Sequence, residues 1–225
     1  MSQAPTAPLP TSPPSSLNPV VPTTHLFLIR HGEVEARYHR VFGGRIDMEL
    51  SPRGHDQARA LARHLRGRQF DAIYASPMRR AQQTLAPLME QRPRPAMILP
   101  ALQEVDFGDW TGLNFPQVLE RFKAHAYEWL HHLEQATIPN AECAQTLRAR
   151  LEPCVRQMLM DHASQSVAVV CHGGVIRVIL SLLLDLPLSK MAGFEIDYAS
   201  LTWIEIQPHK TEVQLLNFTP WRDLP

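Results

Sequence analysis

This chain of 225 residues has few cysteines and no surplus of charge of either sign. Lysine and arginine together number 22, as do aspartate and glutamate, so the formal net charge is zero. Proteins that coat nucleic acids or membrane surfaces usually carry a basic excess, which argues against both as partners. The three cysteines, Cys143, Cys154 and Cys171, are too few and too irregularly spaced for a disulfide framework or a zinc site. We therefore expect a protein of a reducing compartment.

Long apolar runs and the features of a secretory signal are also absent from the sequence. No stretch approaches the roughly 18 consecutive apolar residues that a membrane-spanning helix needs. No lysine or arginine precedes Arg30, and prolines interrupt the apolar residues before it. The sequence thus lacks the charged and the apolar regions of a signal peptide, and we expect the protein to be cytoplasmic.

The apolar content is sufficient for one large core. Residues of the AVILMFWYC set make up 44% of the chain, which excludes global disorder, and the length suits one domain. Residues 1–24 differ from the rest, because prolines stand there among serine, threonine and alanine. Such a segment cannot bury enough surface to offset its ordering entropy. We predict a disordered proline-rich tail over 1–24, which could also serve as a proline-motif ligand, and a single domain over 25–225.

Short apolar runs alternate with longer amphipathic stretches along the predicted domain. This alternation predicts an α/β fold, a three-layer α/β/α sandwich around a mostly parallel sheet. A turn at residues 208–210 separates the last two strands and predicts an antiparallel edge strand. Residues 103–141 look like an insertion that covers one edge of the sheet. The predicted strands are 25–29, 71–75, 96–99, 166–171, 201–207 and 212–218, and the predicted helices are 51–65, 76–90, 115–135, 143–162 and 175–184.

The predicted strands lead into residues that can do chemistry. In open α/β sheets, ligands bind beyond the carboxyl ends of the strands, so side chains placed there by different strands meet at one edge. The residues concerned are Arg30, His31 and Gly32 after the first strand, Arg79 and Arg80 after the second, Glu104 and Asp106 after the third, and His172, Gly173 and Gly174 after the fourth.

This set of residues fits phosphoryl transfer. Arginines bind phosphate oxygens through a fixed fork of donors and remain charged at working pH. A neutral imidazole can attack phosphorus, and a carboxylic acid can protonate the departing oxygen. A helix that begins after Gly174 presents free backbone N–H groups to an anion, and Gly173 allows the backbone to approach it closely.

Five stretches together resemble the histidine phosphatase superfamily, in its phosphoglycerate-mutase-like branch. They are LFLIRHGEVEARY (26–38), GGRIDMELSPRGHDQARAL (43–61), FDAIYASPMRRAQQT (70–84), LQEVDFGDWTG (102–112) and VAVVCHGGVIRVIL (167–180). The resemblance implies a phosphohistidine mechanism. No metal or other cofactor is expected, because the sequence has no Asp/Glu/His cluster with metal-ligand spacing. It implies His31 as the nucleophile, Glu104 as the proton donor and His172 as the second histidine at the phosphate. Arg30 and Arg80 would bind the phosphate with Gly173.

Three positions depart from the family pattern or leave a choice open. Arg37 stands where the family usually has an asparagine that contacts phosphate, so its guanidinium either takes over that contact or points to solvent. Asp106 competes with Glu104 for the role of proton donor, although Glu104 matches the family position. Arg79 is the less favoured neighbour of Arg80.

The most favoured function is hydrolysis of a small-molecule phosphate ester. Residues 127–139 are similar to the alpha-ribazole phosphatase group and its broad-specificity relatives, so alpha-ribazole phosphate or a sugar phosphate is a possible substrate. The alternatives are phosphoglycerate mutase-type transfer and a non-catalytic phospho-ligand binding protein. The short interval from Glu104 to His172 argues against a mutase. The sequence does not indicate the oligomeric state. Six aromatic residues either line a substrate pocket or fill the core: Phe107, Trp110, Phe115, Phe122, Tyr127 and Trp129.

Overall fold

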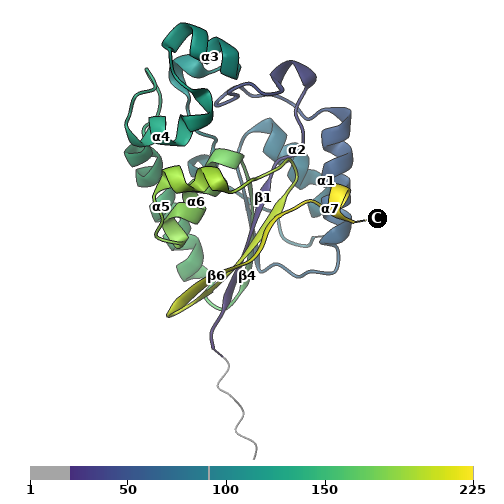
Figure 1. Cartoon of the computed structure of the whole chain (residues 1–225). Coiled ribbons are helices and arrows are strands. Elements are labelled where there is room, and N and C mark those ends of the chain that lie inside the picture. The colour runs from purple at the N-terminus through teal and green to yellow at the C-terminus, as the bar shows by residue number, and fades with distance from the viewer. Residues whose placement is uncertain (1–20, 91, 225) are drawn as a thin grey trace, which may run out of the picture.

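A computed structural model describes residues 21–90 and 92–224 (Figure 1). Its sheet has six strands in the order β3-β2-β4-β1-β5-β6. The pairs β2–β3, β2–β4 and β1–β4 are parallel, whereas β5 and β6 are antiparallel and form one edge. The predicted mostly parallel sheet is confirmed, and its antiparallel edge is a pair of strands. The strands are β1 (Thr24–Arg30), β2 (Ala72–Ala75), β3 (Met97–Ile98), β4 (Ser166–Cys171), β5 (Leu201–Gln207) and β6 (Lys210–Phe218).

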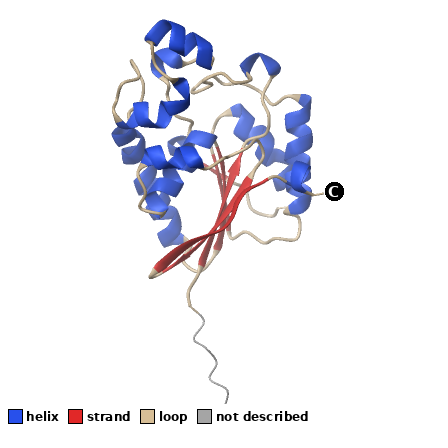
Figure 2. Cartoon of the chain, in the orientation of Figure 1, coloured by secondary structure: helices blue, strands red, loops and turns tan. Residues whose placement is uncertain are grey.

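Helices cover both faces of the sheet, which completes the three-layer sandwich (Figure 2). One face carries α1 and α2, and the other carries α5 and α6. None of the helices in the described residues is long and apolar enough to cross a membrane. The helices are α1 (Pro52–His64), α2 (Arg79–Met89), α3 (Phe115–Phe122), α4 (Trp129–Glu134), α5 (Ala144–Asp161), α6 (Gly173–Leu183) and α7 (Pro220–Asp223).

The predicted disordered tail lies mostly outside the described residues, since residues 1–20 are not described. The predicted helix over 115–135 was wrong as one element. The helix α3 ends at Phe122, because Lys123 adopts a left-handed conformation with φ of 56° and reverses the chain. A separate helix, α4, begins at Trp129. This break lets the two helices fold over the strand ends instead of extending away from them (Figure 1).

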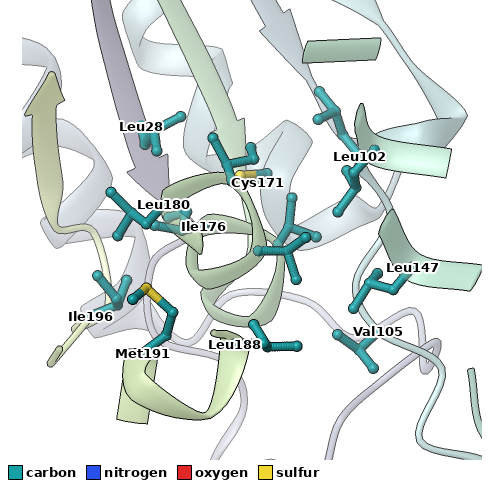
Figure 3. Packing of buried hydrophobic residues seen from close by; sticks show 14 of the residues in the cluster. Leu28, Leu102, Val105, Leu147, Cys171, Ile176, Leu180, Leu188, Met191 and Ile196 are labelled. Carbon is teal, nitrogen blue, oxygen red and sulfur yellow. The ribbon is translucent and has the colours of Figure 1, made fainter. Parts of the chain in front are cut away.

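Alternation along the central strands builds two cores. On β1, Leu26 and Leu28 face α5 and α6, whereas Phe27 and Ile29 face α1 and α2. Figure 3 shows Leu28 of β1 and Cys171 of β4 beside Ile176 and Leu180 of α6. Full burial of such a side chain contributes about 1.5–3 kcal/mol, so the end of β1 is held by a rigid core.

A close backbone contact fixes the loop that follows β1. A Cβ atom on Gly54 would lie 2.0 Å from the carbonyl oxygen of Glu33, and one on Gly32 would lie 2.6 Å from the carbonyl oxygen of Gly54. The first turn of α1 therefore packs directly on this loop. Ser51 caps the helix by accepting a hydrogen bond from the backbone N–H of Gly54 at 3.0 Å.

Candidate active site

Two histidines meet where the central strands end. The parallel register pairs Arg30 of β1 with Cys171 of β4, so the next residue of each strand, His31 and His172, lie side by side. Their ring centroids are 5.2 Å apart. His31 is 5% exposed and His172 is fully buried. The predicted convergence of the two strand ends is therefore present in the fold.

The hydrogen bonds of His31 define which nitrogen can react. Its Nδ1 lies 2.8 Å from the carbonyl oxygen of Gly32, which can only accept, so Nδ1 carries the proton. The Nε2 atom then has a lone pair, and the Nε–H of Arg80 donates to it at 3.2 Å. This tautomer leaves Nε2 without a proton, beside a cation that can also attract a phosphate.

Burial keeps both imidazoles neutral. Desolvation, followed by the charges of Arg80 and Arg30, holds the pKa of His31 well below its ordinary value of 6.5. Desolvation also lowers the pKa of His172 well below 6.5, with Arg80 and His31 adding to the shift. A neutral imidazole is the form that can attack phosphorus, so each ring is in a form capable of nucleophilic attack at neutral pH.

This burial predicts a loss of stability at acid pH. Below about pH 6.5 the unfolded chain binds protons at His31 and His172 that the folded chain does not bind. The free energy of unfolding should therefore fall as the pH falls from 6.5, by up to about 1.4 kcal/mol per pH unit for each histidine. Urea unfolding at a series of pH values measures this slope. The variant His31→Asn should reduce it, and an unchanged slope would contradict the neutral buried ring.

Arg80 is held by the loop before α1. Its two terminal nitrogens donate to the carbonyl oxygens of Ile46 at 2.8 Å and Gly44 at 3.0 Å, and the side chain is 2% exposed. Burial lowers the pKa of Arg80 to about 10, so the guanidinium stays charged at neutral pH. Arg79, its neighbour, instead points outward and pairs with Asp47 and Glu49. The preference for Arg80 at the site agrees with this placement.

Arg30 lines the same pocket as His31. Its Nη1 donates to the carbonyl oxygen of Ile196 at 2.6 Å, and its guanidinium lies 4.1 Å above the ring centroid of Tyr198. A Cβ atom on Gly173 would come within 3.4 Å of the Arg30 Nε atom. Gly173 therefore leaves room at the first residue of α6, where free backbone N–H groups can approach an anion.

Ser76 orients His172. Its hydroxyl oxygen lies 2.7 Å from the Nε2 atom of His172, whereas the Nδ1 atom of that ring is buried without a partner among the described residues. If Ser76 donates its hydroxyl proton to Nε2, then Nδ1 carries a proton and can donate it to a bound anion. We expect this tautomer in the working site.

The variant Ser76→Ala tests that role. Loss of one such hydrogen bond is worth about 0.5–1.5 kcal/mol, so kcat/KM should fall about 2–10-fold and competitive inhibition by inorganic phosphate should weaken in parallel. Ser200→Ala is the matched control, because the hydroxyl of Ser200 is also buried but has no hydrogen-bond partner within the described chain. Equal losses of kcat/KM in both variants would contradict the orienting role of Ser76.

Glu104 supplies the carboxylate of the site. Its Oε2 accepts from the backbone N–H of Gly174 at 3.3 Å, and its Oε1 accepts from the N–H of Val105 at 2.9 Å. Asp106, the competing residue, accepts from Gly108 N–H at 3.0 Å within its own turn and does not line the pocket. The geometry favours Glu104 as the proton donor.

The pocket formed by these residues is built for an anion. Its volume is about 310 Å³, and it is lined by His31, Arg30, Arg80, Glu104 and Arg177 among others. Three buried nitrogens around it lack a hydrogen-bond partner in the part of the chain described here: Arg30 Nε, His172 Nδ1 and Arg177 Nε. Unpaired buried donors are costly, and a phosphate offers several acceptor oxygens to satisfy them.

Comparison with known proteins agrees with this geometry. The family model of the histidine phosphatase superfamily (branch 1) matches residues 26–219. The chain belongs to this superfamily. The match runs from Leu26 within β1 past the end of β6, so it includes every residue of the site.

Relatives of this histidine phosphatase differ in the substrates that their names give. The adenosylcobalamin/alpha-ribazole phosphatase of Escherichia coli K12 is 29% identical over 192 residues, which cover 85% of this chain and 95% of that protein. A 2,3-bisphosphoglycerate-dependent phosphoglycerate mutase of Methylorubrum populi is 32% identical over 179 residues, which cover 76% and 84%. Among solved structures, a mycobacterial glucosyl-3-phosphoglycerate phosphatase is 27% identical with a TM-score of 0.76, covering 87% of this chain and 99% of that one.

Arg37 is not brought to the site of this histidine phosphatase. Its guanidinium pairs with Glu35 at 3.0 Å, and its side chain is 69% exposed. The residue belongs to a short 3-10 helix over Ala36–Tyr38, which directs it to solvent. Of the two alternatives open for Arg37, the structure favours the solvent-exposed one over a phosphate contact.

Arg177 and Tyr198 also line the pocket but were not predicted from the sequence. Arg177 lies one helical turn after Gly173 and donates to its carbonyl oxygen at 3.1 Å, and to that of Phe194 at 3.0 Å. Burial lowers its pKa to about 10. One signal was available: Arg177 is the only charged residue in the apolar stretch 173–184. Tyr198 follows an irregular segment, and no sequence pattern marks it.

The aromatic residues divide between the pocket and the core. Phe107, Phe115 and Trp129 line the pocket. Trp110 is 1% exposed and packs in the core, whereas Tyr127 is 62% exposed and faces solvent. The pocket interpretation therefore holds for Phe107, Phe115 and Trp129 and the core interpretation for Trp110, whereas Tyr127 fits neither. No group of three or more metal-ligating side chains gathers within the described residues.

Proposed function

We propose that this chain hydrolyses the phosphate monoester of a small metabolite through a phosphohistidine formed on His31. One observation carries the proposal: the unprotonated Nε2 of His31 accepts from the Arg80 Nε–H in a pocket where three buried nitrogens have no partner among the described residues. The chain is a phosphatase, in line with its family and its phosphatase relatives. Its three cysteines are unpaired, which supports a reducing cytoplasmic location.

The first step forms a nitrogen–phosphorus bond. The Nε2 atom of His31 attacks phosphorus, and the bond from phosphorus to the ester oxygen breaks. Glu104, in its protonated form, gives its proton to that leaving oxygen. Arg30, Arg80 and the Nδ1–H of His172 stabilise the charge on the other three oxygens, which is where catalysis of phosphoryl transfer mostly originates.

The second step restores the enzyme. The Glu104 carboxylate accepts a proton from a water molecule, whose oxygen attacks phosphorus and breaks the bond to Nε2. Inorganic phosphate leaves, the imidazole regains its lone pair and Glu104 is again protonated. Two displacements with a good nucleophile thus replace a single difficult one.

The pocket supports a leaving group with an apolar or planar part. Phe42 and Phe115 are stacked with ring centroids 5.3 Å apart, and Phe107 lies 4.9 Å from Phe42. Alpha-ribazole phosphate and sugar phosphates both remain substrates to test, because the aromatic walls can stack on a heterocycle or a sugar face.

The deciding experiment measures free phosphate released from a panel of sugar phosphates, nucleotides and alpha-ribazole phosphate. Each assay is run with and without EDTA, and phosphoglycerate interconversion is measured beside it. We expect release of phosphate that EDTA does not remove. Interconversion faster than release would favour a mutase, which the short interval between Glu104 and His172 argues against. Binding of substrate without either reaction would favour the non-catalytic alternative.

A further inference from the structure

One face of α2 contacts the nucleophile and the backbone beside it. Arg80 and Thr84 lie one helical turn apart, so their side chains share a face of the helix, and each residue is 2% exposed. The Arg80 Nε–H donates to the Nε2 atom of His31 at 3.2 Å. The Thr84 hydroxyl accepts from the backbone N–H of Gly32, the residue after His31, at 2.9 Å. The same helix therefore holds the imidazole at one point and its backbone at another.

These contacts belong to a closed cycle of four hydrogen bonds. The Thr84 hydroxyl donates its only proton to the carbonyl oxygen of Arg80 at 2.8 Å, so the lone pairs of its oxygen are left for the Gly32 N–H. The Nδ1–H of His31 donates to the carbonyl oxygen of Gly32 at 2.8 Å, and the Arg80 contact with Nε2 completes the cycle. Buried hydrogen bonds that form a chain strengthen one another. The four residues thus form one connected unit.

The peptide group after Gly32 is anchored separately. The N–H of Glu33 donates at 2.8 Å to the Oε1 atom of Gln57, a side chain of α1 that is 2% exposed. The carbonyl group that receives the His31 Nδ1–H belongs to this same planar peptide, so its direction is fixed. The preceding peptide, between His31 and Gly32, depends on Thr84 for the acceptor of its N–H.

Attack on phosphorus must break one bond of the cycle. The lone pair of Nε2 cannot accept from Arg80 and bond to phosphorus at the same time, so the Arg80 N–H has to turn to a phosphate oxygen. The bonds through Thr84 do not involve the reacting atoms, so they can hold His31 and Arg80 in place while the direct contact is lost. Such placement matters, since a displacement of about 1 Å can cost about 10²-fold in rate.

We propose that Thr84 is a positioning residue for the phosphorylation of His31. Its hydroxyl links the backbone of the nucleophile to the backbone of Arg80, and so keeps Nε2 directed at a phosphate that the guanidinium binds. This role rests on the proposed function, in which Nε2 attacks phosphorus. It extends that function to a residue that does not line the pocket.

The variant Thr84→Val tests the hydroxyl with little change in the shape of the side chain. It puts a methyl group in place of the oxygen, so the buried Gly32 N–H loses its acceptor. We expect kcat/KM for p-nitrophenyl phosphate, which includes the phosphorylation of His31, to fall about 10–100-fold. Competitive inhibition by inorganic phosphate should stay within about threefold, because the carbonyl acceptors of the Arg80 guanidinium are untouched.

Two further variants separate positioning from a general loss of packing. Thr84→Ser keeps the hydroxyl and removes only the methyl group, so its kcat/KM should stay within about threefold of the natural value. Thr202→Val is the matched control, because Thr202 is 1% exposed and its hydroxyl accepts from the backbone N–H of Asn217 at 3.3 Å, in the β5–β6 pair. It should keep the natural kcat/KM. Urea unfolding gives the folded fraction of each variant, to which the activities are normalised.

The ¹⁵N resonance of the His31 Nε2 atom gives a signature that needs no turnover. It is assigned by its absence from the spectrum of His31→Asn. The resonance should be the same in the natural chain and in Thr84→Ser, where the Arg80 N–H remains at hydrogen-bond distance. In Thr84→Val it should shift, because that contact is no longer held by the backbone.

The outcomes distinguish this role from the proposed function. With an active natural chain, an unchanged kcat/KM or an unchanged Nε2 resonance in Thr84→Val would overturn the positioning role. Equal losses in the two Thr84 variants, or a parallel loss of phosphate inhibition in Thr84→Val, would also overturn it, because they would indicate a general loosening of the site. A natural chain that neither releases phosphate nor forms a phosphohistidine would overturn the proposed function itself, whatever the Thr84 variants show.

Discussion

The variant His31→Ala should lose at least about 10⁴-fold in turnover, because it removes the atom that forms the phosphoenzyme. The measurement is kcat with p-nitrophenyl phosphate, followed by trapping with ³²P-labelled substrate. The natural enzyme should retain label that is stable to base and lost in acid, as expected of a phosphohistidine. The variant should retain none.

A matched control keeps this result interpretable. His209 lies in the exposed turn between β5 and β6, so His209→Ala should preserve both turnover and labelling. Urea unfolding shows whether the His31 variant is folded, and a folded variant that still turns over at the natural rate would refute the nucleophile. Label retained by a folded His31→Ala protein would place the phosphoryl group on another residue.

The variant Glu104→Gln should separate substrates by their leaving groups. Alkyl phosphates need a proton on the departing oxygen, so their kcat should fall about 10²–10⁴-fold. The phenolate of p-nitrophenyl phosphate leaves without that proton, so His31 should still be phosphorylated quickly. Hydrolysis of the phosphohistidine should then be slow, because the variant has no carboxylate at position 104 to activate water. Stopped-flow absorbance should therefore show a burst of one p-nitrophenol per active site, followed by a slow steady state.

The neutral amide is a conservative probe of this role. The amide has a single acceptor oxygen, so glutamine can keep the shorter contact, from the N–H of Val105 at 2.9 Å, but not also the contact from the N–H of Gly174 at 3.3 Å. Asp106→Asn is the comparison, because that carboxylate serves only its own turn and should show no leaving-group dependence. Equal losses on alkyl and aryl substrates in the Glu104 variant would exclude it as the acid.

The sequence predicted the parts of the site that regular structure places. Strand periodicity located the ends of β1 and β4, and parallel pairing then required His31 and His172 to meet. Arg80 was predictable because it follows β2 in the first turn of α2. These positions depend on local patterns that each strand or helix carries by itself.

Other features depend on contacts between distant segments. The guanidinium of Arg80 is positioned by the carbonyls of Gly44 and Ile46, which lie in a loop without a regular pattern. The break between α3 and α4 depends on the left-handed conformation of Lys123. Lysine rarely adopts this conformation, so the sequence gives no sign of the break. Arg177 was overlooked because its place in the pocket depends on the distant segment around Phe194, whose carbonyl oxygen accepts from its guanidinium. The helix sequence alone does not show this contact.

The place of β1 in the sheet has a consequence for biosynthesis. This strand pairs with β4 and β5, so both of its neighbours are translated more than a hundred residues after it. The backbone of His31 is also bonded to Ala199, whose N–H donates to the His31 carbonyl oxygen at 3.0 Å. A ribosome-bound nascent chain thus holds an unpaired apolar strand until β4 and β5 have been translated. Chaperone protection of that strand, and an inactive enzyme until its last strands emerge, follow from the topology.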